Sequence, residues 1–164
     1  MKKTIFLFIS VFIGFCSDAQ EFEGKIYYDS LKIMPPFKYY TVDGKAITQA
    51  DLKKKKQTVF IYIKLSCPYC AQEIEIIKKN INDFTHTQFY IIARADSSEL
   101  QKFISDYSLI RYPQINMLSD KDKLYKKFTI ARSTPSIHIY DKKKKLIIFS
   151  EGVMRREVLM KYIN

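Results

Sequence analysis

Two cysteines three residues apart are the residues of this chain best suited to do chemistry. Cys67 and Cys70 enclose Pro68 and Tyr69. Thiols at this spacing can form a disulfide and be reduced again, so the pair can exchange two electrons with another dithiol. The apolar run 58–65 before the pair predicts a strand, and the sequence after it predicts a helix. The dithiol is therefore expected where a strand meets a helix N-terminus.

That position distinguishes the two thiols. Unpaired backbone N–H groups and the helix macrodipole stabilise a thiolate at Cys67 and lower its pKa. Pro68 suits the first helical turn, where no N–H is needed. Cys70 lies one turn further on and should be more buried. We therefore expect Cys67 to be the nucleophile and Cys70 to resolve its mixed disulfide, giving a Cys67–Cys70 disulfide.

The first residues have the pattern of an export signal. Residues 1–3 are basic, an apolar stretch follows over residues 5–15, and small residues precede Gln20 by three and one positions. This predicts a signal peptide over residues 1–19, cleaved before Gln20. The apolar stretch is short for a membrane span. An uncleaved anchor and a lipid on Cys16 are the alternatives.

Cleavage would leave two thiols of the three in the chain. Structural disulfides of exported proteins usually join distant segments, and a disulfide closing so small a loop restrains the unfolded chain little. The pair at Cys67 and Cys70 is therefore predicted to serve reactivity or metal binding and not to brace the fold.

The length and composition predict one globular domain. The chain has 164 residues, of which 47% are hydrophobic, and a net charge of +11. The length is enough to bury a sizeable core. Much of the positive charge lies in Lys53–Lys56 and Lys142–Lys145, which are expected to be solvated loops. An acidic partner or a membrane surface is the alternative, and export argues against nucleic acid.

Strand and helix patterns alternate along the rest of the chain. They predict a parallel core, an antiparallel edge made by the last hairpin, and helices on both faces. Ser98 with Gln101, and Ser119 with Asp122, are predicted to cap two of the helices. The expected elements are a hairpin over 37–47, a short helix capped by Thr48, strand 58–65, a helix from 67 whose apolar face continues to Phe84, strand 88–93, helix 98–106, strand 114–118, helix 120–128, strands 136–140 and 146–149, and helix 153–163.

Together these features resemble the thioredoxin fold. The strand that ends in the C-x-x-C motif, Thr134-Pro135 before a hairpin and Glu151-Gly152 after it carry the resemblance. Residues 43–52 and 112–128 resemble exported TlpA/ResA-like thiol–disulfide oxidoreductases of the redoxin class. The resemblance covers residues 37–164, preceded by an extension over residues 20–36.

The resemblance implies a fold and an activity. The fold would be a thioredoxin-like α/β domain, a central mixed sheet flanked by helices, with an N-terminal β-hairpin extension. A cis Thr134–Pro135 bond would face the dithiol, and the backbone of Thr134 would pair with extended substrate, while Pro68 and Tyr69 shape access.

The activity implied is reduction of disulfides in exported proteins of the periplasm or envelope, including those of cytochrome c maturation. An upstream membrane donor would supply electrons to the monomeric protein. No cofactor and no metal would be needed.

The chain departs from the thioredoxin pattern in two places. Ile61 stands where thioredoxins carry a buried carboxylate that accepts the proton of the second cysteine. Ser66 replaces the aromatic residue before the first cysteine. Glu73 and Lys64 could tune the site but are predicted to be surface charges.

Several other functions remain open. A copper-binding module could use the two cysteines with His86 or His138, although His138 falls within a strand; zinc would want four ligands, and no second C-x-x-C exists. A peroxidase of the same fold fits less well, because Ser66-Cys67-Pro68 lacks the residues that precede a peroxidatic cysteine. An intact dithiol argues against a non-catalytic binding domain. The direction of electron flow is not set by sequence, so an oxidase or isomerase is also an alternative.

Overall fold

The computed structural model describes residues 25–27 and 32–163. The predicted signal peptide lies outside the described residues. No helix within the described ranges has the length and apolar character needed to cross a bilayer. The strands are β1 (Lys25–Tyr27), β2 (Lys38–Tyr40), β3 (Ala46–Thr48), β4 (Gln57–Ile63), β5 (Thr87–Ala93), β6 (Ile115–Ser119), β7 (Ser136–Tyr140) and β8 (Leu146–Glu151); the α-helices are α1 (Pro68–Lys79), α2 (Ser97–Asp106), α3 (Tyr125–Phe128) and α4 (Arg156–Tyr162).

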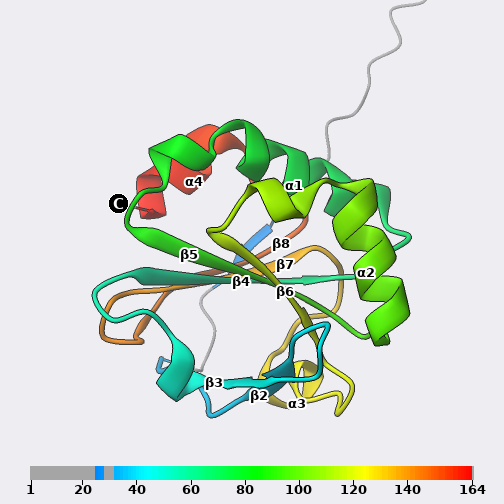
Figure 1. The fold of residues 1–164 in the computed structure, drawn as a ribbon. Helices are drawn as coiled ribbons and strands as arrows, with labels where there is room; N and C mark the ends of the chain where they lie inside the picture. The colour runs from blue at the N-terminus through cyan, green and yellow to red at the C-terminus, as the bar shows by residue number, and fades with distance from the viewer. Residues whose placement is uncertain (1–24, 28–31, 164) are drawn as a thin grey trace, which may run out of the picture.

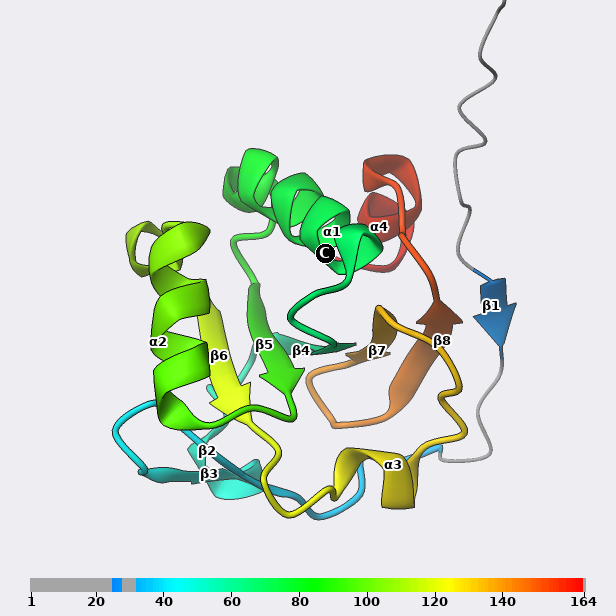
Figure 2. The same cartoon turned by 90° about the vertical axis from the view of Figure 1, so that its right-hand side faces the viewer.

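The strands form one mixed sheet in the order β1-β8-β7-β4-β5-β6-β2-β3. β4, β5 and β6 are parallel, whereas β7 pairs with β4 and β8 in antiparallel fashion. The N-terminal hairpin of β2 and β3 joins the sheet through β6, and β1 pairs with β8. The prediction of a parallel core with an antiparallel edge is confirmed. Figure 2 looks onto the end of the sheet where β4 leads into α1.

The two faces of the sheet have different cores. Alternate residues of β4, including Ile61 and Ile63, pack with aliphatic side chains from α1, α2 and α4. The intervening residues Phe60 and Tyr62 pack with aromatic residues from the hairpin and with Tyr125 at the start of α3. Helices were expected on both faces. Figure 1 shows helices on both faces, but unequally: the three longer helices share one face, and the short α3 covers the other together with the hairpin.

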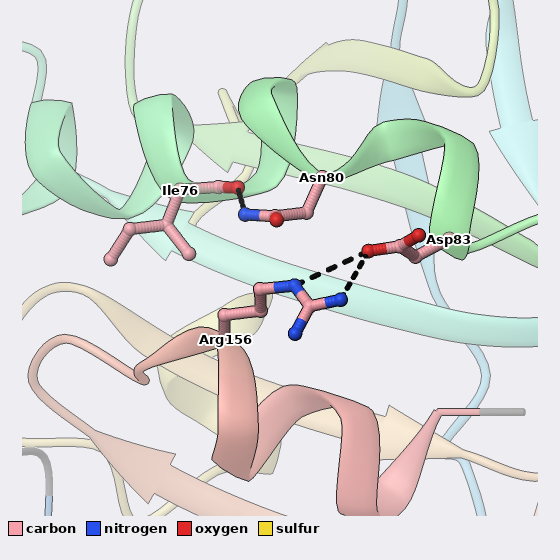
Figure 3. Close-up of polar contacts among 4 residues, drawn as sticks. All are labelled: Ile76, Asn80, Asp83 and Arg156. Carbon is pink, nitrogen blue, oxygen red and sulfur yellow. Dashed lines mark hydrogen bonds and ion pairs between the residues drawn. The ribbon is translucent and has the colours of Figure 1, made fainter.

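The end of α1 far from the cysteines is held by α4. The guanidinium of Arg156 forms an ion pair of 2.8 Å with Asp83, which lies in a short 3-10 turn, Ile81–Asp83, after α1. The side chain of Asn80 donates to the carbonyl of Ile76 at 2.7 Å. Figure 3 shows these contacts side by side. They fix the C-terminal end of the helix that carries the dithiol.

Two of the predicted helix caps were wrong. Asp96 caps α2, and Glu99 returns the hydrogen bond to the Asp96 N–H. The helix starts earlier than expected, so Ser98 lies inside the first turn and donates its hydroxyl to the Asp96 carboxylate at 2.7 Å. The helix expected over 120–128 is shorter, and Ser119 does not cap it, because the Ser119 hydroxyl donates to the carbonyl of Ala95 at 2.6 Å. The Asp120 carboxylate accepts the N–H groups of Leu124 and Tyr125, which holds a turn before α3.

The two lysine runs meet at the amino end of β4. Residues of Lys53–Lys56, together with Lys142 and Lys144, line a cavity of about 410 Å³. The other end of β4 leads to the cysteines. A strand of seven residues therefore separates this basic surface from the dithiol, a distance of about 20 Å along the chain direction.

Candidate active site

The dithiol lies at the junction between β4 and α1. Cys67 is the N-cap of α1, and its sulfur accepts the backbone N–H of Cys70 at 3.3 Å. Pro68 occupies the first helical position, as expected from its missing N–H. Both cysteines are free thiols; Cys67 is partly exposed and Cys70 is buried. The sulfur that can meet a substrate is therefore that of Cys67.

The surroundings separate the pKa values of the two thiols. Partial burial alone would raise the pKa of Cys67, but hydrogen bonds from the Cys70 thiol and backbone, with others from Thr134 and Tyr69, lower it overall. Burial, together with the hydrogen bond to Cys67, raises the pKa of Cys70 to about 12. The thiolate at this site therefore resides on Cys67.

The segment before β7 faces the reactive sulfur. The Thr134–Pro135 peptide bond is cis, and the Cys67 thiol donates to the carbonyl of Thr134 at 3.6 Å. The buried carboxylate of Glu151 accepts the backbone N–H groups of Arg132 and Ser133. The next residue, Gly152, donates its N–H to the carbonyl of Pro135 at 2.8 Å and has a positive φ of 88°.

The residues Glu151 and Gly152 thus hold the loop that contacts Cys67. Glu151 fixes the two residues before Thr134, and Gly152 fixes Pro135. Positive φ favours glycine at residue 152 because a Cβ would be strained there. The Glu-Gly pair after the final hairpin therefore positions the loop opposite the dithiol.

The prediction that Glu73 is a surface charge was wrong. Glu73 is fully buried on α1, and one of its carboxylate oxygens accepts the backbone N–H of Met154 at 2.7 Å. Its other oxygen, Oε1, has no hydrogen-bond partner among the described residues. Burial raises the pKa of Glu73 to about 8, and the Met154 hydrogen bond offsets part of this effect.

The sequence held a signal for this burial. Glu73 lies three residues after Cys70, and Ile74 and Ile77 follow on the same apolar face of α1. A carboxylate within an apolar helical stripe is an exception that points to function or to a specific partner. Ile61, which stands in place of the thioredoxin carboxylate, is buried in the same core.

The other predicted residues have different surroundings. Tyr69 is exposed on the first turn of α1, with 43% of its surface accessible, and Pro68 and Lys64 are also exposed. His138 is buried in β7, where its Nδ1 lies 2.7 Å from the hydroxyl of Tyr125. In the described ranges no three His, Cys, Asp or Glu side chains gather as a metal site would require.

A cavity of about 570 Å³ opens beside the dithiol. It is lined by Ser66, which precedes Cys67, and by Thr134, whose carbonyl receives the Cys67 thiol. The cavity lies at the carboxyl ends of β4 and β5, the place where open α/β sheets commonly bind ligands. Sequence reasoning did not indicate this cavity, since its walls come from four separate segments.

The mixed sheet, the thiol pair at a helix start and the loop facing it define a thioredoxin-like protein. The chain belongs to the AhpC/TSA family, which it matches over residues 31–156. Family membership together with the paired thiols supports an oxidoreductase.

Comparison with known proteins agrees with this fold. A secreted disulfide oxidoreductase of Mycobacterium tuberculosis, homologous to E. coli DsbE, has a TM-score of 0.63 at 22% identity, with 77% of this chain and 92% of that chain covered. The thioredoxin domain of a thiol-disulfide oxidoreductase from Bacteroides vulgatus has a TM-score of 0.64 at 18% identity, with 80% and 96% covered.

A curated relative carries a different activity in its name. A Helicobacter pylori protein named as a peroxiredoxin (bcp) is 27% identical in an alignment of 131 residues, which covers 76% of this chain and 84% of the relative. The two structural neighbours are less than 25% identical to this chain, so their likeness concerns the fold.

Proposed function

We propose that this protein is an exported thiol–disulfide oxidoreductase of the TlpA/ResA-like kind, which reduces disulfides of envelope proteins. The observation that carries the proposal is the position of Cys67. Its sulfur caps α1, has a lowered pKa, and contacts the Thr134 carbonyl of the cis-proline loop. A structural disulfide or a metal ligand would not need these three features in combination.

The proposed reaction transfers two electrons from the dithiol to the substrate. The Cys67 thiolate attacks one sulfur of the substrate disulfide, so a mixed disulfide forms and one substrate thiolate leaves. Cys70 then loses its proton and attacks the Cys67 sulfur, which releases the second substrate thiol. The protein ends with a Cys67–Cys70 disulfide, and a dithiol donor must reduce it before the next turnover.

The second step needs a proton acceptor, because burial raises the pKa of Cys70 to about 12. Glu73 is the buried carboxyl group nearest along α1, one turn beyond Cys70 and on the same face. A carboxyl group with a pKa of about 8 is present in both protonation states near neutral pH, as a general base requires. We therefore assign Glu73 the role that Ile61 cannot fill.

The same proposal includes the direction of electron flow and the location of the protein in the envelope. Reduction is favoured, with a membrane dithiol donor upstream and exported proteins, including cytochrome c precursors, as substrates. The equilibrium redox potential of the Cys67–Cys70 pair tests the direction. A value below about −250 mV supports a reductase, and one near about −120 mV would make the protein an oxidase.

A thiol peroxidase is the second candidate, because the named relative is a peroxiredoxin and the family match covers the active site. Peroxide would oxidise the Cys67 thiolate to a sulfenic acid, and Cys70 would condense with it to a disulfide and water. The rate of disulfide formation with hydrogen peroxide, compared with that for a peptide disulfide at equal concentration, decides between the two. Faster reaction with the peptide disulfide supports the reductase.

A further inference from the structure

The cavity beside Cys67 carries an excess of positive charge. Four cationic side chains line it, from the loop after β4, the residue after β5, α3 and the cis-proline loop: Lys64, Arg94, Lys126 and Arg132. All four are exposed to solvent. They come from segments separated by up to about seventy residues of sequence, so the fold and not a local lysine run brings them together.

No carboxylate among the described residues pairs with these charges. The one carboxylate in the lining belongs to Glu99, which already accepts the backbone N–H of Asp96 in the cap of α2. A cleft lined by one sign of charge attracts ligands of the opposite sign.

Apolar groups complete the walls of the cavity. Tyr62, Ile63, Leu65 and Ala131 line it together with the cations. Such a wall suits the methylene groups of a side chain that ends in a charged group. A cavity of this volume also falls in the range of ordinary ligand pockets and is concave, unlike a flat surface that binds membranes or nucleic acid.

We propose that this cavity is a substrate subsite for acidic residues, which binds Asp or Glu side chains that flank the target cysteine of a protein substrate. The inference rests on the proposed function. Ser66 and Thr134 line the cavity and also adjoin Cys67, so a polypeptide bonded to the Cys67 sulfur has its neighbouring residues at the cavity mouth. Successive residues of an extended chain are about 3.3 Å apart, so the first few residues on one side lie within reach.

The subsite makes the protein selective among exported disulfides. Substrates with acidic residues beside the cysteine gain attraction at the step where the mixed disulfide forms. That gain is electrostatic, so salt weakens it for such exposed groups. Substrates with lysine at the same position meet repulsion instead and react more slowly.

The test uses three disulfide-containing peptides that differ only in the residues flanking the reactive cysteine, which are Glu, Gln or Lys. Second-order rates of reduction are measured for the full-length reduced protein at low and high salt. The wild-type protein should react fastest with the Glu peptide. The double variant Arg94→Gln/Lys126→Gln should lower the rate ratio of Glu to Gln peptides by about tenfold, the effect of two exposed charge pairs.

A matched control removes two charges far from the cavity. Lys54→Gln/Lys142→Gln changes the net charge equally but alters the basic surface at the other end of β4. This variant should keep the wild-type ratio of rates, which excludes an effect of net charge alone. Circular dichroism and thermal unfolding of each variant establish that all are folded.

The outcomes distinguish a failure of the acidic subsite from a failure of the proposed reductase function. A wild-type protein that reduces all three peptides at equal rates would overturn the acidic subsite and leave the reductase intact. A protein that reduces none of them, although its thiols are free, would overturn the proposed function itself. Equal losses of selectivity in both double variants would also overturn the subsite, because the recognition would then come from net charge.

Discussion

Replacing Glu73 by Gln should change how the stability of the protein depends on pH. The carboxyl group is fully buried, and burial raises its pKa from the ordinary value of 4.5 to about 8. Between these two values the folded protein holds a proton that the unfolded chain has released. The free energy of unfolding contributed by Glu73 therefore falls as pH rises from about 4.5 to about 8, and is constant outside that window.

The size of this effect follows from the two pKa values. One unit of pKa difference between the folded and unfolded states corresponds to about 1.4 kcal/mol. The difference between the two pKa values of Glu73 therefore sets an upper bound of about 5 kcal/mol on its contribution to the free energy of unfolding. Local rearrangement around the ionised carboxylate reduces this, and we expect about 3 kcal/mol. Gln keeps a carbonyl oxygen that can accept the Met154 N–H but cannot ionise, so Glu73→Gln should remove the whole pH-dependent contribution.

The assay is urea unfolding of the reduced protein at several pH values from about 5 to about 8.5. The difference in unfolding free energy between Glu73→Gln and wild type should increase by about 3 kcal/mol in favour of the variant across this range. Glu157→Gln removes an exposed carboxylate of α4 and is the matched control. A Glu73 difference that stays constant within about 0.5 kcal/mol from pH 5 to 8.5 would refute a protonated, buried Glu73.

Three further predictions concern the site and its supports. Iodoacetamide should alkylate Cys67 near neutral pH well before Cys70, whose pKa is raised to about 12 by burial; equal rates for both would contradict the assigned roles. Glu151→Ala should lower the free energy of unfolding by about 2–3 kcal/mol and slow peptide-disulfide reduction, because two loop N–H groups lose their acceptor; unchanged kinetics would show that the loop needs no such support. Tyr125→Phe should cost about 1–2 kcal/mol, since the hydroxyl contacts the buried His138, but should leave the redox potential unchanged; a shifted potential would link this aromatic cluster to the dithiol.

The sequence predicted the local features well because they depend on local rules. The C-x-x-C motif, the proline at the start of α1 and the alternation of strands and helices led to the dithiol position and the mixed sheet. Caps were less predictable, since several polar residues near a helix start compete for the role. At α2 the cap is formed by Asp96 and Glu99. Serine is also a common capping residue, so the sequence pointed equally well to Ser98.

The rest of the site depends on contacts between distant segments. The burial of Glu73 requires the loop after β8 to lie on α1, where Met154 donates its N–H. The cationic cavity requires Arg94, Lys126 and Arg132 to converge from separate elements. No local pattern encodes such convergence. The helical spacing from Cys70 to Glu73 was the one local sign of this burial, although the sequence alone led us to expect Glu73 at the surface.

The central claim is that Cys67 and Cys70 act as one two-electron couple, with Cys67 reacting first. Intact mass spectrometry of the reduced protein mixed with a peptide disulfide tests this directly. The wild-type protein should lose about two mass units as its disulfide forms, since two hydrogens leave. Cys70→Ser should accumulate an adduct with the peptide, and Cys67→Ser should remain unchanged. An adduct on Cys67→Ser, or full peptide reduction by that variant, would contradict the account.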